Sequence, residues 1–160
     1  MSKDDFLALL KKHQGIIYKL VSLYANDGEE KKDLYQEILL QAWKSFRHFR
    51  GESQFSTWLY KVALYTILTQ KRKVSVIDYK GTMEEYVDQF SAEAAEPVRT
   101  GSLRTAIRRL PETDRAIVSL HLDGYENREI AALIGISANH VAVKLHRIKQ
   151  YLSTKIKQIE

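Results

Sequence analysis

The feature that most constrains the fold is a pair of short helical patterns around a Gly-Ile-Ser turn, in 126-ENREIAALIGISANHVAVKLHRIKQYL-152. Ile130, Ala131 and Ile134 face a core at helical spacing, and Gly135 supplies the left-handed residue that ends the first helix. Ser137 can cap the second helix. The inward row of that second helix comprises Val141, Leu145, Ile148 and Leu152. This arrangement is typical of a helix-turn-helix.

The outward side of the second helix carries side chains that can read DNA. These residues are Asn139, His140, Ala142, Val143, Lys144, His146 and Arg147. Asparagine can bond adenine, arginine can bond guanine or a phosphate, and a valine or alanine methyl can meet the thymine methyl. Exposed Ala142 and Val143 have no evident role on a helix that only meets solvent. The alternative is an ordinary helical hairpin with a basic surface.

Composition favours a partner that is a polyanion, because the net charge is +5 and the pI is near 9.3. The chain has no cysteine, which excludes disulfides and thiolate metal sites and fits a reducing cytoplasm. We expect no secretion signal and no membrane-spanning segment. The histidines are scattered, and no nucleophile–base array, Gly-rich phosphate loop or metal-ligand cluster is visible. We therefore predict a protein that is not an enzyme and has no cofactor or metal.

Helical periodicity extends along most of the chain, so the predicted fold class is all-α, with two small helical domains joined by a flexible linker. The expected domains are residues 1–73, an acidic linker over 74–99, and residues 100–160. In the first domain we expect helices from a Ser2 cap to about residue 24, over about 29–48, and from a Ser53 cap to about residue 72. In the second we expect helices over about 101–109 and 111–123 before the helix-turn-helix. One short helix is expected in the linker, near 83–90.

The stretch 43-WKSFRHFRGESQFSTWLYKV-62 interleaves aromatic and basic residues. We expect Trp43, Phe46 and Trp58 in the core, whereas Phe49 lies at a helix end beside arginines. Tyr60 and Tyr65 lie off the main apolar row. An aromatic ring near a basic groove can stack an unpaired base; the alternative is that the tyrosines sit at the rim of a small core.

The helix over about 29–48 has an outward face that mixes acids, amides and one leucine. Its residues are Asp33, Gln36, Glu37, Leu40, Gln41 and Lys44. A single exposed leucine is ordinary on a protein surface. A strip of this composition can also be a docking face for a helix of another protein.

Four stretches carry a resemblance to a known family. They are 33-DLYQEILLQAWKSF-46, 49-FRGESQFSTWLYKVA-63, 110-LPETDRAIVSLHLDGY-125 and 129-EIAALIGISANHVAVKLHRIKQYL-152. In order and spacing, the sequence closely resembles an extracytoplasmic-function sigma factor of bacterial RNA polymerase, the minimal two-domain type. With the linker, these stretches account for nearly the whole chain.

The resemblance implies that the first domain is sigma region 2. The face from Asp33 to Lys44 would dock on the clamp helices of the largest polymerase subunit. The segment from Phe49 to Tyr65 would open the promoter −10 element and hold a flipped base. By motif position, the residues around that base would be Ser45, Phe49, Val62 and Tyr65, with Tyr60 alongside.

The resemblance implies that the second domain is sigma region 4, whose helix from Ser137 enters the major groove of the −35 element. The family's contact positions fall on Ala142, Val143, His146 and Arg147, with Asn139 and Lys144 nearby. The implied partners are core RNA polymerase, including the flap of its second-largest subunit, promoter DNA, and an anti-sigma factor. No direct membrane insertion is expected.

The sequence departs from the family at three places. Tyr65 stands where relatives often have asparagine, so a stacking ring replaces an amide. Glu126 stands where serine or threonine is common, so that helix cap must come from Glu126 or Asn127. Ala142 and Val143 replace basic or polar residues, which favours readout through thymine methyls and groove shape.

Two alternatives to a sigma factor remain open on the sequence. A stand-alone helix-turn-helix regulator explains the C-terminal half but gives the aromatic–basic segment no role. A helical interaction protein that docks on polymerase without touching DNA predicts that Phe49→Ala and Arg147→Ala leave function intact.

Overall fold

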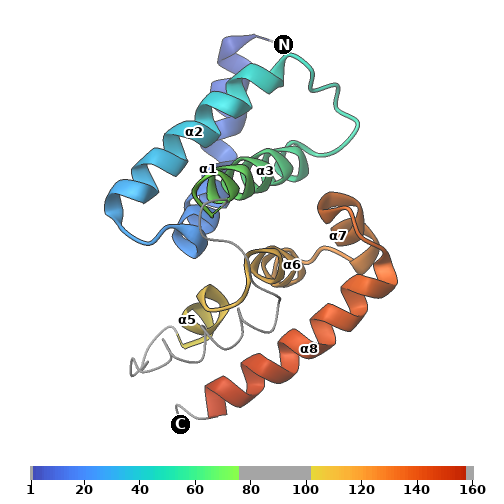
Figure 1. The fold of residues 1–160 in the computed structure, drawn as a ribbon. Coiled ribbons are helices and arrows are strands. Elements are labelled where there is room, and N and C mark those ends of the chain that lie inside the picture. Colours follow the sequence, from blue (N-terminus) through green and yellow to red (C-terminus); the bar gives the residue numbers. More distant parts are fainter. Residues whose placement is uncertain (1, 76–101, 158–160) are drawn as a thin grey trace. The chain divides into compact units, whose positions relative to one another are not determined.

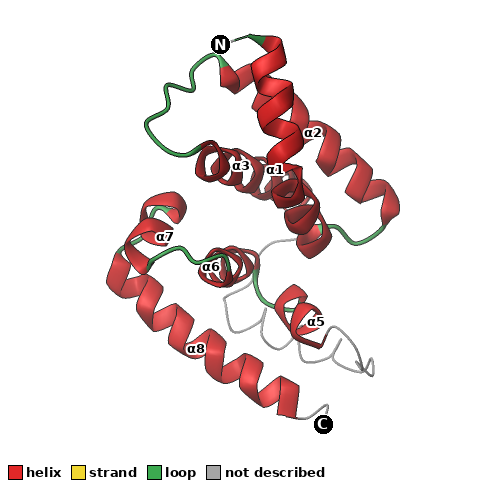
Figure 2. Ribbon diagram, turned by 180° about the vertical axis from the view of Figure 1, so that it is seen from behind, coloured by secondary structure: helices red, strands yellow, loops and turns green. Residues whose placement is uncertain are grey.

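The computed structural model describes residues 2–75 and 102–157, and every regular element within these ranges is an α-helix (Figure 2). The predicted all-α class is confirmed. The chain divides into two compact units, residues 1–79 and 80–160. Most of the predicted linker, with its short helix near 83–90, lies outside the described residues. The domain limits at 73/74 and 99/100 therefore stay predictions.

The first unit consists of α1 (Lys3–Tyr24), α2 (Gly28–Phe46) and α3 (Phe55–Ser75), each packed against the other two (Figure 1). Ser2 caps α1 as predicted: its Oγ accepts the Asp5 N–H at 3.2 Å, and the Asp5 carboxylate accepts the Ser2 N–H at 2.9 Å. Asp27 caps α2 by accepting the Glu30 N–H at 2.8 Å. Both helix starts thus satisfy backbone donors that would otherwise have no partner.

The structure corrects the predicted ends of two helices. α2 ends at Phe46 rather than near residue 48, because the His48 N–H turns back to the Ser45 carbonyl at 2.9 Å. Ser53 does not cap α3: its hydroxyl donates to the Gln54 carbonyl at 3.3 Å, and the helix begins at Phe55. At its other end α3 continues to Ser75, past the predicted limit.

Aromatic rings from all three helices and the α2–α3 loop form one cluster. We call this the aromatic cluster; it comprises Phe6, Trp43, Phe46, Phe49, Phe55 and Trp58, and each ring lies 4.9–6.2 Å from at least one other. Phe6, Phe46 and Phe55 are buried. Trp43 was expected in the core, but 46% of it is exposed, and its ring lies at the edge of the cluster, 5.2 Å from that of Phe6. Such packed rings add stabilisation beyond their buried area.

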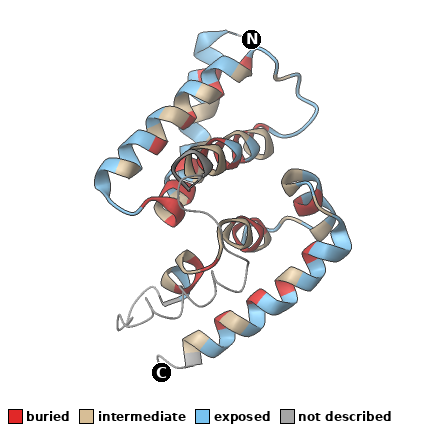
Figure 3. Ribbon diagram, viewed as in Figure 1, coloured by how far each residue is buried: buried red, intermediate tan, exposed pale blue. Residues whose placement is uncertain are grey.

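The second unit consists of α5 (Ser102–Arg108), α6 (Glu112–Leu122), α7 (Asn127–Ile134) and α8 (Ala138–Lys157). The predicted stop at Asp123-Gly124 follows α6 directly: Asp123 is its C-cap, and Gly124 lies at φ +93°. Pro111 occupies the N-cap of α6 rather than its first helical position. α8 packs against α5, α6 and α7, and buried and exposed residues alternate along it (Figure 3).

The turn between α7 and α8 forms as the sequence predicts. Glu126 is the N-cap of α7, and the Glu129 carboxylate accepts its N–H at 3.1 Å. Gly135 ends α7 in the left-handed conformation at φ +89°. The Ser137 Oγ then caps α8 by accepting the His140 N–H at 3.1 Å. Side chains and one glycine therefore fix the angle at which α8 leaves α7.

An ion pair joins the start of α2 to the end of α3 in the first unit. The Lys71 ammonium bonds the Glu30 carboxylate, which also accepts the Asn26 N–H at 3.0 Å. Burial raises the pKa of Glu30, but the Lys71 ammonium and the Asn26 N–H outweigh it, so the pKa lies below its ordinary value of 4.5. The ion pair therefore joins two residues that lie 41 positions apart in the sequence, in addition to the apolar contacts of the core.

We predict that Glu30→Gln lowers the free energy of unfolding at pH 7 by about 0.5–1 kcal/mol more than Glu29→Gln does. Both substitutions remove an acid from the first turn of α2, so their difference reports the contacts that Glu30 makes with Lys71 and with the Asn26 N–H. Because the folded pKa is lowered, the contribution is present above pH 4.5 and is lost as the pH falls through the folded value. Urea unfolding followed by tryptophan fluorescence measures it, since Trp43 and Trp58 both lie in this unit. Equal losses at pH 7 would contradict the prediction.

We predict that Gly135→Ala destabilises the second unit by roughly 1–2 kcal/mol, because a Cβ is strained at φ +89°. Gly135→Asn is the matched control, since asparagine tolerates the left-handed conformation and should cost less. Thermal unfolding followed by far-UV circular dichroism measures both. An alanine variant as stable as the asparagine variant would refute this account of the turn.

Candidate nucleic-acid interface

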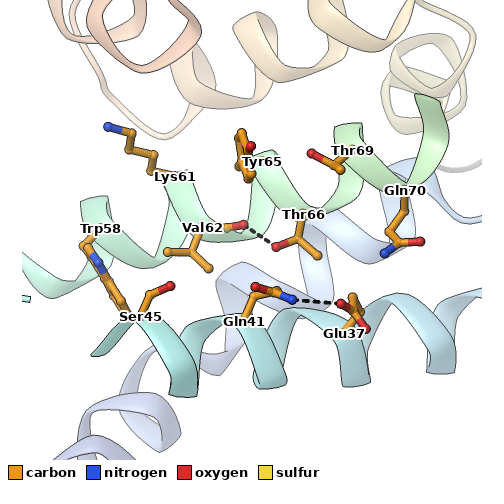
Figure 4. Close-up of a pocket in the computed structure, with 10 residues that line it drawn as sticks. All are labelled: Glu37, Gln41, Ser45, Trp58, Lys61, Val62, Tyr65, Thr66, Thr69 and Gln70. Carbon is orange, nitrogen blue, oxygen red and sulfur yellow. Dashed lines mark hydrogen bonds between the residues drawn. The ribbon is translucent and has the colours of Figure 1, made fainter. Parts of the chain in front are cut away.

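A groove of about 520 Å³ runs between α2 and α3 in the first unit (Figure 4). α2 contributes Glu37, Gln41 and Ser45, and α3 contributes Trp58, Lys61, Val62, Tyr65, Thr66, Thr69 and Gln70. In the close-up, the α2 residues point toward α3, and Val62 and Thr66 point toward α2. Lys61, Tyr65 and Thr69 point away from α2. The groove therefore has polar α2 side chains along one wall and Val62 and Thr66 along the other, and Lys61, Tyr65 and Thr69 lie at its rim.

Hydrogen bonds order part of the lining. The Gln41 Nε2 donates to the Glu37 Oε1 at 3.0 Å, and the Thr66 hydroxyl donates to the Val62 carbonyl at 2.8 Å (Figure 4). Ser45 and the second amide hydrogen of Gln41 remain able to donate to a guest. Tyr65 is 73% exposed, so most of its ring is available for contact. This lining can hold a flat ring that carries hydrogen-bonding atoms on its edge.

The groove brings together three of the five residues predicted around a flipped base: Ser45, Val62 and Tyr65. Phe49 is not part of the lining. Its ring lies in the aromatic cluster, 5.3 Å from that of Trp58, so it adjoins the groove through Trp58. Whether these residues contact DNA stays a prediction.

Tyr60 does not lie at the surface, so its expected position off the apolar row is wrong. It is 1% exposed, and the Lys19 ammonium of α1 lies 5.1 Å from its ring centre. Two residues separate directions on a helix by about 200°, so Tyr60 faces away from the side that carries Val62. Tyr60 belongs to the core, and its ring is not open to a DNA base.

Sequence reasoning missed Trp58 and Thr66 as groove residues. Trp58, Val62 and Thr66 follow one another at intervals of four, which places them on one face of a helix. That spacing was available in the sequence. Trp58 was expected in the core and is half-buried, with one part in the aromatic cluster and another in the groove.

Some residues of the predicted docking face of α2 are exposed to solvent, and others line the groove. Asp33, Gln36, Leu40 and Lys44 are exposed, and Leu40 is 45% exposed. Glu37 and Gln41 are half-buried and line the groove. Trp43, three residues after Leu40, shares its face and enlarges the exposed apolar area. The docking role of these residues stays a prediction.

In the second unit, α8 separates an inward row from an outward face. Val141, Leu145, Ile148 and Leu152 are buried as predicted. The exposed residues are Asn139, His140, Ala142, Val143, His146 and Arg147. Val143 is 41% exposed, so its methyl groups are open to a partner.

Lys144 was expected on the outward face, and this is wrong. Its side chain is 14% exposed and donates to the Asp114 carboxylate of α6 at 3.2 Å. A charged partner on the neighbouring helix draws the ammonium inward, while the aliphatic stem covers apolar surface. Lys144 is therefore not free to contact DNA in this conformation.

The part of the chain that the structure describes holds no group of three or more histidine, cysteine or acidic side chains placed to bind a metal ion. None of its helices combines the length and the apolar character that crossing a bilayer requires.

Two family models match the chain in order. Sigma-70 region 2 matches residues 9–76, and sigma-70 region 4 matches residues 100–152. The ECF RNA polymerase sigma-E factor of Escherichia coli (strain K12) is 29% identical over 96% of this chain and 87% of its own length. The RNA polymerase sigma-H factor of Pseudomonas aeruginosa is 24% identical over 98% of this chain and 89% of its own length.

Two solved structures share the fold. The sigma factor RpoE in complex with the anti-sigma factor NepR from Bartonella quintana aligns with a TM-score of 0.69 and 21% identity, over 98% of each chain. CnrH in complex with the cytosolic domain of CnrY aligns with a TM-score of 0.61 and 18% identity, over 99% of this chain and 92% of CnrH. A stand-alone helix-turn-helix regulator gives no role to the first unit, which the region 2 model matches. The chain belongs to the extracytoplasmic-function sigma factors, which direct bacterial RNA polymerase to promoters.

Proposed function

We propose that this sigma factor opens promoters by seating a flipped base of the −10 element in the groove between α2 and α3. The observation that carries the proposal is the lining of that groove, which includes the ring of Trp58, the hydroxyl of Ser45 and the amide of Gln41, with the exposed ring of Tyr65 at its rim. A base that leaves the duplex loses stacking and pairing, and a protein must replace both. Ring contacts replace the stacking, and the polar groups replace part of the pairing.

The groove also suits the backbone that accompanies the base. Lys61 is exposed, lies one turn before Tyr65, and points out of the groove (Figure 4). An ammonium at this position can meet a phosphate of the extruded strand. Phe49, held in the aromatic cluster next to Trp58, would support the ring that meets the base.

For the polymerase, we propose that the exposed face of α2 docks on the clamp helices of the largest subunit. Leu40 and Trp43 would be the apolar anchors, and Asp33, Gln36 and Lys44 would be polar contacts around them. Interfaces of this kind draw most of their affinity from a few buried apolar or aromatic anchors. The flap of the second-largest subunit would be the second dock.

For the −35 element, we propose that the outward face of α8 enters the major groove. Asn139 and Arg147 offer hydrogen bonds to base edges, and the methyl groups of Ala142 and Val143 can meet thymine methyls. His140 and His146 complete the face. Because the face carries few fixed charges, contact with bases rather than phosphates would dominate its selectivity.

We infer that the protein works in the cytoplasm, where the polymerase acts, and that an anti-sigma factor binds it. The inference is supported by a relative of the same fold that was solved with its anti-sigma factor NepR. Sigma factors are initiation factors, so RNA synthesis would stay with the core enzyme. This chain would contribute binding energy and strand separation.

Run-off transcription with core polymerase tests the role of the groove. We predict that Tyr65→Ala reduces initiation from a duplex promoter, by a loss of about 1–3 kcal/mol in open-complex stability, while Tyr65→Phe retains most of it because the ring still stacks. A template with a preformed mismatch bubble at −10 should restore part of the activity of Tyr65→Ala. An alanine variant that initiates as well as wild type on duplex templates would contradict the proposed role of the groove in base binding.

The docking face yields a separate prediction. Leu40→Ala should weaken binding to core polymerase about tenfold, because it removes an apolar anchor from the interface. Leu103→Ala is the control, since Leu103 is 40% exposed but lies in the other unit, on α5. Competition against a labelled sigma factor for core enzyme measures both affinities. Equal affinity for the two variants would contradict the proposed dock.

A further inference from the structure

Lys144 of α8 and Asp114 of α6 form an ion pair in which both side chains are largely shielded from water. The Lys144 Nζ lies 3.2 Å from the Asp114 Oδ1, and each side chain is only 14% exposed. Exposed lysine–carboxylate pairs contribute little to stability. A pair withdrawn from water interacts more strongly, and removing one partner leaves the other charge uncompensated.

The position of Lys144 along α8 suits the ion pair to a role beyond stability. Val143 precedes it on the outward face, and Leu145 follows it in the buried row. The buried row holds α8 by apolar contact, which is non-directional. Burial of that row sets which side of α8 faces the core. A hydrogen-bonded ion pair at the edge of the row has a direction, so it narrows the rotation of α8 about its own axis further.

We propose that Lys144 is a positioning residue, which fixes the rotation of α8 on α6 so that Ala142, Val143, His146 and Arg147 face the −35 element. This inference rests on the proposed −35 role of α8. It assigns Lys144 a function different from the one that motif position implied. Lys144 would act through Asp114 and would make no phosphate contact of its own.

The test compares Lys144→Met, Asp114→Asn and the double variant in full-length chains assembled with core polymerase. Binding is measured on a promoter duplex identified by sequencing transcript 5′ ends, and on the same duplex with a scrambled −35 element, over a range of salt concentrations. We expect each single variant to bind about five- to tenfold more weakly through the −35 element, and the double variant to bind no more weakly than either. Lys149→Met, on an exposed lysine of the same helix, is the charge-matched control.

The salt dependence separates positioning from phosphate contact. A positioning role leaves the slope of log affinity against log salt unchanged in Lys144→Met. Loss of a phosphate contact would lower the magnitude of that slope by about one, with Asp114→Asn binding normally, and would overturn the inference.

The charge-swapped variant Asp114→Lys/Lys144→Asp gives a second readout. Restored −35 binding supports the inference, and a swapped chain that folds by circular dichroism but does not discriminate the −35 element overturns it. If wild-type holoenzyme itself ignores the −35 element, the proposed function of α8 fails. Wild-type discrimination together with variants that bind normally would overturn the positioning role alone.

Discussion

The packing of α3 against α2 is the contact on which the candidate sites of the first unit depend. α2 and α3 pack against each other, and Ala42 on α2 and Ala63 on α3 are fully buried. Ile38, Leu59 and Ile67 of the same two helices are fully buried as well. The groove lies along the open side of the same contact, so its lining is positioned by the core. Lys71 and Glu30 add a polar link between the two helices.

Periodicity predicted that α3 exists, but it misjudged which residues of α3 are buried. α3 packs against both α1 and α2, so its buried face is wide and includes Tyr60, Ala63 and Leu64 as well as Leu59. A pattern read as a single apolar stripe assigns the edge positions wrongly. Tyr60 was therefore placed at the surface, and Trp58 was placed wholly in the core. The groove needs both helices, so the spacing within α3 alone could not reveal it.

Residue types that act on their immediate neighbours predicted the turn between α7 and α8 more accurately than they predicted the positions of other side chains. Gly135 and Ser137 act within a few residues of themselves, so their roles can be read from the sequence. Lys144 was misplaced because its partner Asp114 lies 30 residues away on another helix. Helical spacing puts Lys144 near the outward face, and only the packing of α6 on α8 turns its ammonium inward. A long side chain at the border between the buried and the exposed face of a helix can turn toward either face, so helical spacing alone does not place its charged end.

α2 carries both the proposed polymerase dock and one wall of the groove. Leu40 and Lys44 are exposed, while Gln41 and Ser45, one position further along, line the groove. Neighbouring residues on a helix are separated by a fixed rotation, so docking one face of α2 also fixes the other. A base held against Gln41 would thus have a defined position relative to the polymerase, because both contacts are made by the same helix. If the proposed contacts form, each would raise the effective concentration of the next, because they belong to one chain.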